Sequence, residues 1–219
     1  YVDDSSGRWR VREELERIDI KNRRPTSRTL QDHLCAALRA GIPQWQAIIV
    51  VDQVSEDGCG VVTPRLRRQL SELQRNHPQV VFLVDSRSRI DRFAGLPIKP
   101  NHHEAASALH TRPARSVRAA LEQGRQLAGR SRRHVFLTLS ARGMIVCDKD
   151  GPRHIAGFPI TDRRIDPVGA GDSTTAALVS CLAAGASPNE AAIVANLVGS
   201  VTVQQIGTTG TASPAQIRR

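Results

Sequence analysis

Apolar runs that end in an acidic residue alternate with amphipathic helical patterns through the middle of the chain. Residues 47–52 (AIIVVD) and 80–85 (VVFLVD) are continuously apolar up to the final aspartate. Such runs are typical of parallel strands buried on both faces. Between them, Thr63 and Pro64 form a favourable helix start, and leucines follow at intervals of three or four positions. This alternation predicts an α/β fold, a doubly wound and mainly parallel sheet with helices on both faces.

Further helices and a hairpin are predicted on either side of these strands. The predicted elements are a helix over 29–40, a short strand over 96–99, a helix over about 114–127, a strand region over 134–147 with a turn at 148–151 and a return to 156, a helix of small residues over 176–184, and a helix from 187 that ends before 207. The first helix is expected to bury Leu30, Leu34, Ala37 and Leu38. Apolar and polar residues alternate over 15–20, as in a half-buried strand, and residues 21–25 resemble a loop.

A glycine-rich turn over 165–175 (IDPVGAGDSTT) runs directly into the helix of small residues. Glycines on both sides of an alanine permit unusual backbone conformations and bring amide groups close to a ligand. The first turn of a helix also carries unpaired N–H groups and partial positive charge. The pattern therefore predicts an anion cradle, most naturally for phosphate. Asp172 within it has two interpretations: a helix N-cap, or a base that takes the proton of an attacking hydroxyl.

The stretch 166–172 (DPVGAGD) resembles the C-terminal signature of the ribokinase-like (PfkB) carbohydrate kinases, which is usually Asp-Thr-x-Gly-Ala-Gly-Asp. The resemblance implies that the amides of Gly169, Ala170 and Gly171 form the anion hole for the transferred phosphoryl group. It also implies that Asp172 is the catalytic base. A proline stands where the family commonly has threonine, and we expect it to change loop stiffness more than chemistry.

Asn101 and Glu104 have the spacing of an N-cap residue and its capping-box partner, which is a purely structural interpretation. Asn-x-x-Glu after a short strand also resembles the kinase family's second motif, which organises Mg²⁺ and phosphate. This motif and the glycine-rich signature follow each other in the family's order, so the resemblance implies that both residues help to bind metal and phosphate. The capping box would hold the two side chains in the geometry that this role needs. Glu104 would act through water, because Mg²⁺ keeps much of its hydration.

The segment from Thr138 through Ser140 to Gly143 (TLSARG) is close to the family's Thr-Leu-Gly-x-x-Gly, which shapes the nucleotide pocket. Ser140 replaces the first glycine, so its contact with a nucleotide is open. The resemblance places Asn196 beside the adenine. A hydrogen bond between helices is the alternative, since Asn196 has apolar neighbours and a buried amide needs a partner.

The closing segment 206–214, which includes Gly207, resembles the family's last loop. In the family this loop borders the nucleotide, and in several members it helps to hold a monovalent cation with the loop that corresponds to Asp166. The resemblance thus extends to K⁺ at Asp166, although these residues do not reveal whether the protein depends on a cation.

Asp52 and Asp85 end the two apolar runs, at the carboxyl edge where open α/β sheets bind ligands. Both could equally cap the loops that follow. His102 and His103 are adjacent, and neighbouring helical side chains are expected to diverge, so we do not expect them to ligate a metal together.

The chain has 31 Lys and Arg against 21 Asp and Glu, a net charge of +10 that would suit a nucleic-acid binder. Aromatic residues make up only 3%, however, so platforms for stacking bases are scarce. A solvated basic surface that attracts phosphorylated ligands is the favoured interpretation, and nucleic acid is not expected as a partner. The four cysteines are scattered without metal-site spacing, which favours a reducing cytoplasm. No apolar run is long enough for a membrane span.

The resemblance covers most of the chain from about residue 47, and its final part is most similar to the kinase module of bifunctional heptose-phosphate kinase and ADP-heptose synthase enzymes. It implies that 1–219 is the C-terminal part of a single ribokinase-like domain, with 1–28 as lid-return strands and a loop. The implied activity is ATP- and Mg²⁺-dependent phosphorylation of a hydroxyl on a sugar or sugar phosphate. The alternative is a non-catalytic nucleotide-binding or regulatory module, and the oligomeric state is open between monomer and homodimer.

Overall fold

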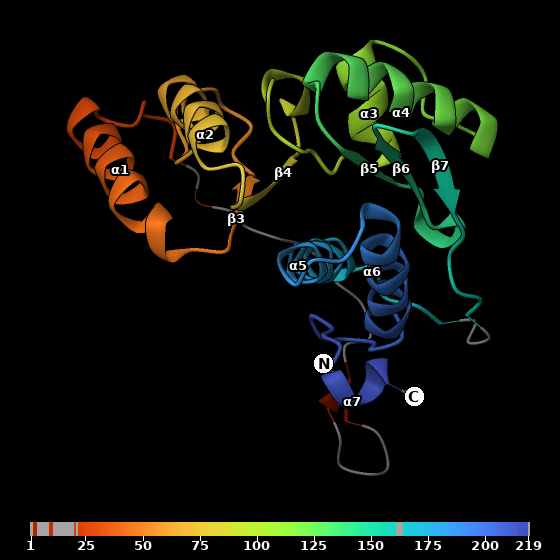
Figure 1. Cartoon of the computed structure of the whole chain (residues 1–219). Helices are drawn as coiled ribbons and strands as arrows, with labels where there is room; N and C mark the ends of the chain where they lie inside the picture. Colours follow the sequence, from red (N-terminus) through yellow and green to blue (C-terminus); the bar gives the residue numbers. More distant parts are fainter. Residues whose placement is uncertain (1, 4–8, 11–19, 21, 161–163, 219) are drawn as a thin grey trace.

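The computed structural model describes residues 2–3, 9–10, 20, 22–160 and 164–218, and Figure 1 shows their arrangement. The helices are α1 (Arg28–Gly41), α2 (Pro64–Asn76), α3 (His102–Leu109), α4 (Val117–Ser131), α5 (Ala170–Ala183), α6 (Pro188–Thr202) and α7 (Pro214–Ile217). The strands are β1 (Val2–Asp3), β2 (Trp9–Arg10), β3 (Ala47–Asp52), β4 (Val81–Ser86), β5 (Val135–Thr138), β6 (Met144–Asp148) and β7 (Gly151–Ile155). No helix within these ranges is long and apolar enough to cross a membrane.

The central sheet begins with the two apolar runs that the sequence identifies as parallel strands. β3 and β4 pair in parallel, with Ala47 opposite Val81. Ile98 then forms parallel bridges to Val84 and Val135, so the predicted short strand joins β4 to β5 through a single residue. β5, β6 and β7 follow as antiparallel neighbours, and the predicted hairpin forms between β6 and β7. The predicted α/β architecture is confirmed.

Helices cover both faces of this sheet, because alternate residues of a strand point to opposite sides. In β4, Phe82 and Val84 join a core formed with α1 to α4, whereas Leu83 joins a second core formed with α5 and α6. In Figure 1, α3 and α4 accordingly lie above the strands and α5 and α6 below them. Burying each such side chain stabilises the fold by about 1.5–3 kcal/mol.

Three details of the predicted helices are wrong. The helix of small residues, predicted over 176–184, is α5, which begins six residues earlier at Ala170. In α1, Leu30 and Ala37 are exposed and Cys35 is the buried residue, because α1 meets α2 along a narrow stripe that Leu34 and Leu38 flank. The helix predicted at about 114–127 is α4, which starts later because Ser116 caps it by accepting a hydrogen bond from the backbone N–H of Ala119.

The N-terminal region is described only in part. β1 and β2 pair in antiparallel fashion. Residues 22–25 form no regular element, as the loop prediction states. The strand predicted at 15–20 lies outside the described residues except for Ile20, which is fully exposed and not in a strand.

Candidate active site

The glycine-rich turn opens α5 in the way that an anion cradle requires. Gly169 is the N-cap residue and has a left-handed backbone, with φ of 80°. A β-carbon at this position would lie 2.8 Å from Cγ2 of Thr209, so both conformation and space favour glycine. Because Gly169 is the cap, Asp172 is not. Asp172 lies in the exposed first turn and makes no hydrogen bond or ion pair with any described residue.

A cavity of about 250 Å³ opens beside this turn, between the sheet and α6. Six of the predicted site residues line its wall: Thr138, Ser140, Gly143, Ala170, Gly171 and Asn196. Gly169, Asp172 and Gly207 do not line it. The structure therefore brings the predicted nucleotide segment and the glycine-rich turn together around one hollow, although they are separated by some thirty residues in the sequence.

The side chain of Asn196 does not form a hydrogen bond to another helix. Its Nδ2 donates to the backbone oxygens of Ile155 and Ala156, at 3.1 and 3.0 Å, where β7 ends. The predicted hydrogen bond between helices is therefore wrong, because the end of β7 offers free carbonyl groups alongside α6. The placement of Asn196 beside an adenine stays a prediction.

We expect Asn196→Ala to destabilise the protein by about 1–3 kcal/mol, since two carbonyl groups lose their donor. It should also weaken ATP binding, because the chain after β7 forms one wall of the cavity. Chemical denaturation and calorimetric titration with ATP would measure the two effects. Ser200→Ala is the matched control, since Ser200 lines the same cavity but its hydroxyl donates to Leu197 in its own helix. Equal ATP affinities in the two variants would contradict the expectation.

The turn between β5 and β6 depends on Gly143. Its φ is 84°, and a β-carbon there would lie 2.1 Å from the backbone oxygen of Ile155 and 2.4 Å from the nitrogen of Gly157. Backbone atoms cannot yield as a flexible side chain can. The family resemblance identified this glycine, and the close approach of the chain after β7 is the physical reason for it.

We expect Gly143→Ala to lower the free energy of unfolding by at least about 2 kcal/mol through backbone strain and displacement of the chain after β7. Gly129→Ala is the control, because Gly129 lies in α4 with nothing within 4 Å of an added β-carbon. That change should stabilise the helix by up to about 1 kcal/mol. Urea denaturation of both variants tests the contrast, and a Gly143 variant as stable as the unmodified protein would refute it.

Asn101 and Glu104 form the predicted capping box at the start of α3. Oδ1 of Asn101 accepts from the N–H groups of His103 and Glu104, and Oε2 of Glu104 accepts from the N–H of Asn101 at 2.8 Å. Asn101 also bridges to Thr138 in parallel, which places the box next to the cavity wall. The structural interpretation is thus confirmed, and it leaves a carboxylate oxygen of Glu104 without a described hydrogen bond.

The charges around Glu104 fit a water-mediated Mg²⁺ site. Burial raises the pKa of the Glu104 carboxyl group; the N–H of Asn101 opposes this shift, and the negative charge of Asp85 adds to it. The positive charges of Lys99 and Arg87 lower the same pKa, so the protein itself compensates part of the negative charge beside Glu104. The described residues hold no cluster of three or more His, Cys, Asp or Glu side chains that could bind a metal by themselves.

Asp85 connects this motif to the glycine-rich turn. Its Oδ2 lies 2.9 Å from Nζ of Lys99 in a buried ion pair and accepts from Oγ1 of Thr175 at 3.4 Å. Thr175 also donates to the carbonyl oxygen of Gly171. Asp85 therefore bonds across three elements instead of capping its own loop. Neither Lys99 nor Thr175 was identified from the sequence, because their partners are distant along the chain.

Asp52 lies at the same edge of the sheet, but both of its carboxylate oxygens already accept hydrogen bonds from other side chains. Arg89 donates to both of its carboxylate oxygens, at 2.7 and 3.2 Å, and Ser86 donates at 2.8 Å. Arg89 also donates to the backbone oxygens of Val54 and Ser55. Asp52 thus anchors the loop after β3 through Arg89, which is neither of the two roles weighed from the sequence.

Asp166 ties the glycine-rich turn to the last loop. Its carboxylate accepts from the N–H groups of Val168 and Gly207, at 3.0 and 3.1 Å. The two loops that the resemblance pairs are therefore in contact, and K⁺ at Asp166 stays a prediction. The expectation for the adjacent histidines is wrong in its geometry, since the rings of His102 and His103 lie 4.2 Å apart at the start of α3.

Comparison with known proteins finds relatives along most of the chain. Curated relatives named bifunctional protein HldE include one from Bradyrhizobium sp. (strain ORS 278), 28% identical over 93% of this chain and 40% of the relative. Another, from Bradyrhizobium diazoefficiens, is 32% identical over 93% of this chain and 40% of the relative. The chain thus spans about two fifths of these proteins.

Solved structures share the fold. Phosphofructokinase-2 from Escherichia coli in complex with potassium has a TM-score of 0.69 at 20% identity, over 85% of this chain and 60% of that one. Ribokinase from Thermotoga maritima has a TM-score of 0.58 at 15% identity, over 78% of this chain and 55% of that one. Residues 67–216 match the model of the pfkB family carbohydrate kinases. The chain therefore belongs to the pfkB family of carbohydrate kinases.

Proposed function

We propose that the protein transfers the γ-phosphoryl group of ATP to a hydroxyl of a sugar or sugar phosphate. The observation that carries this proposal is the left-handed Gly169, which starts α5 so that Ala170 and Gly171 form part of the cavity wall. The amide groups at this helix start and the helix dipole provide positive potential for a phosphate. The cavity would hold the nucleotide, with Thr138, Ser140 and Asn196 around it.

In this mechanism the acceptor hydroxyl gives its proton to the carboxylate of Asp172. The acceptor oxygen then bonds to the γ-phosphorus in line, and the bond from that phosphorus to the ADP oxygen breaks. The amides of Gly169, Ala170 and Gly171 stabilise negative charge on the phosphoryl oxygens. Mg²⁺, held through water by Asn101 and Glu104, would supply further charge neutralisation. The exposure of Asp172, without a bond to other described residues, leaves its carboxylate available for this role.

Two further features support the setting of this activity. Cys35, Cys59 and Cys147 are buried free thiols, which suits a reducing cytoplasm. The carboxylate of Asp166 lies where the two loops proposed to hold K⁺ meet. The Escherichia coli phosphofructokinase-2 neighbour is itself a potassium complex. We also propose that 1–219 is the C-terminal part of one kinase domain; the chain spans about two fifths of its curated relatives. A homodimer is compatible with this arrangement.

A non-catalytic nucleotide-binding module is the second candidate. It is favoured by the position of Asp172 outside the cavity wall. Incubating the complete gene product with ATP, Mg²⁺ and a panel of sugars and sugar phosphates would separate the two. ADP formation that requires one acceptor supports the kinase. ATP binding without phosphoryl transfer to any acceptor supports the module.

A further inference from the structure

Two adjacent cavities that share part of their wall lie away from the candidate active site, between α2 and the end of α4. One has a volume of about 500 Å³ and the other about 490 Å³, and both are lined by Ser71, Arg75 and Ala94. The second also reaches the residues that directly precede β5, at the opposite edge of the sheet from Asp85 and Thr138. We call this pair of cavities the arginine groove. The arginines in its wall that form no ion pair with a described residue are Arg68, Arg75, Arg130, Arg132 and Arg133.

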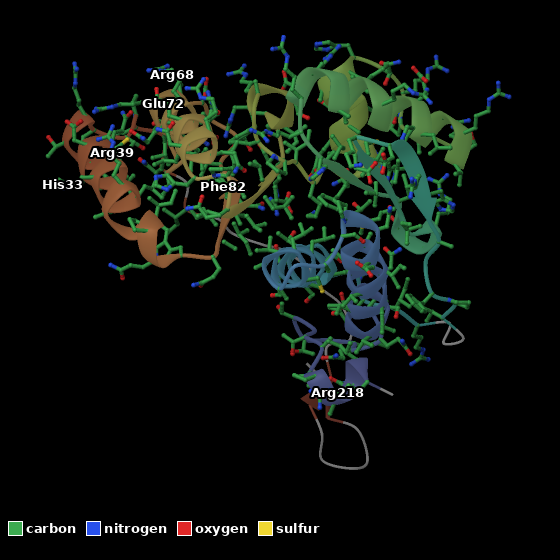
Figure 2. All side chains as sticks on the ribbon, in the orientation of Figure 1. His33, Arg39, Arg68, Glu72, Phe82 and Arg218 are labelled. Atoms are coloured by element: carbon green, nitrogen blue, oxygen red, sulfur yellow. The ribbon has the colours of Figure 1, made fainter. Side chains whose placement is uncertain are left out.

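The charge of the groove is largely unbalanced. Arg67 and Arg92 also line it, but both pair with Asp57. Glu72 is the carboxylate in the described wall, and Figure 2 shows it with Arg68 on the outer side of α2. Clustered guanidinium groups repel one another, and a multivalent anion would relieve this repulsion while accepting hydrogen bonds from several of them.

Two of the arginines, Arg130 and Arg133, are held by hydrogen bonds before any ligand arrives. Arg130 donates from Nη1 to the carbonyl oxygen of Ala108 at 2.8 Å, and Arg133 donates from Nε to that of Gly95 at 3.2 Å. Each guanidinium keeps further N–H groups for a ligand. Arg132 ends α4 with a left-handed φ of 56°, a position that glycine would occupy with less strain. An arginine is thus present where the backbone alone favours glycine.

The composition of the wall indicates the class of ligand. Among the residues that the structure describes, no aromatic side chain lines either cavity of the groove, so the wall offers no surface on which bases could stack. Guanidinium groups instead match the geometry of phosphate oxygens. We propose that the arginine groove is a second anion site that binds a chain of phosphate groups, separate from the cavity beside α5. This inference does not depend on the kinase activity.

Calorimetric titration with sodium tripolyphosphate tests this proposal. One variant combines Arg75→Gln, Arg132→Gln and Arg133→Gln within the groove. Its matched control combines Arg112→Gln, Arg115→Gln and Arg118→Gln, which are exposed positions outside both cavities and remove the same charge. We expect the groove variant to bind tripolyphosphate at least about tenfold more weakly than the control, and binding to weaken with added salt.

Three results would overturn the proposal. An equal loss of tripolyphosphate affinity in both variants would show that binding depends only on the net charge of the protein. Unchanged affinity in the groove variant would place tripolyphosphate elsewhere, such as at the start of α5. Tighter binding of a single-stranded oligonucleotide with the same number of phosphates would indicate a nucleic-acid site. If the groove variant does not fold by circular dichroism, Arg75→Gln alone serves instead, because Arg75 makes no described hydrogen bond, and it should still weaken binding about threefold or more.

Discussion

Asp172→Asn should lower phosphoryl transfer by at least about a thousandfold while leaving ATP affinity nearly unchanged. Asparagine keeps the size of the side chain but cannot accept the proton of the acceptor hydroxyl. The nucleotide cavity should be intact, because Asp172 is exposed and does not line it. The measurement is ADP release by the complete gene product with its best acceptor, together with calorimetric ATP binding.

Asp91→Asn is the control for the lost charge, since Asp91 is also exposed and forms no ion pair with a described residue. It should retain full turnover. Turnover of Asp172→Asn close to that of the unmodified protein would exclude Asp172 as the base. The proposed mechanism would then be wrong.

Arg89→Met should lower the free energy of unfolding by about 3–5 kcal/mol, the largest stability effect that we expect from a side chain in this chain. The change leaves the carboxylate of Asp52 buried, at 3% exposure, without its cationic partner. It also frees the loop after β3, since Arg89 donates to the carbonyl oxygens of Val54 and Ser55. Urea denaturation followed by circular dichroism would measure the loss.

Two comparisons test the physical reason. In Asp52→Asn with Arg89→Met, the buried charge is gone, so the double variant should be more stable than Arg89→Met alone. Arg125→Met removes the partner of Glu122, but that pair is exposed, and the cost should stay below about 1 kcal/mol. If Arg89→Met cost no more than Arg125→Met, burial of the ion pair would not matter as argued.

The elements of the fold could be predicted because their signals are local. Thr63 and Pro64 start α2, Ser187 and Glu190 form the capping box of α6, and Asn101 with Glu104 does the same for α3. Each signal lies within four residues of the hydrogen bonds that it predicts. Errors appear where burial depends on a distant neighbour, as in α1, where α2 covers Cys35 and leaves Leu30 exposed.

The candidate site could be predicted in part. Family resemblance supplied Thr138, Ser140, Gly143 and Asn196, and the structure places all four around one cavity with Gly171. The bonding of Asn196 was missed, because the carbonyl groups at the end of β7 are about forty positions away. A residue type and its spacing indicate that a buried amide needs a partner, but they do not identify that partner.

The sequence by itself determined the order of most strands and helices, the caps of α2, α3 and α6, and the glycine-rich turn at the start of α5, since each depends on the conformational preferences of a few consecutive residues. Only the tertiary structure decided which groups meet: Asp52 with Arg89, Asp85 with Lys99 and Thr175, and the arginines of α2 with those at the end of α4. The physical reason is that ion pairs, cavities and charge clusters form between segments that only packing against a common sheet brings together.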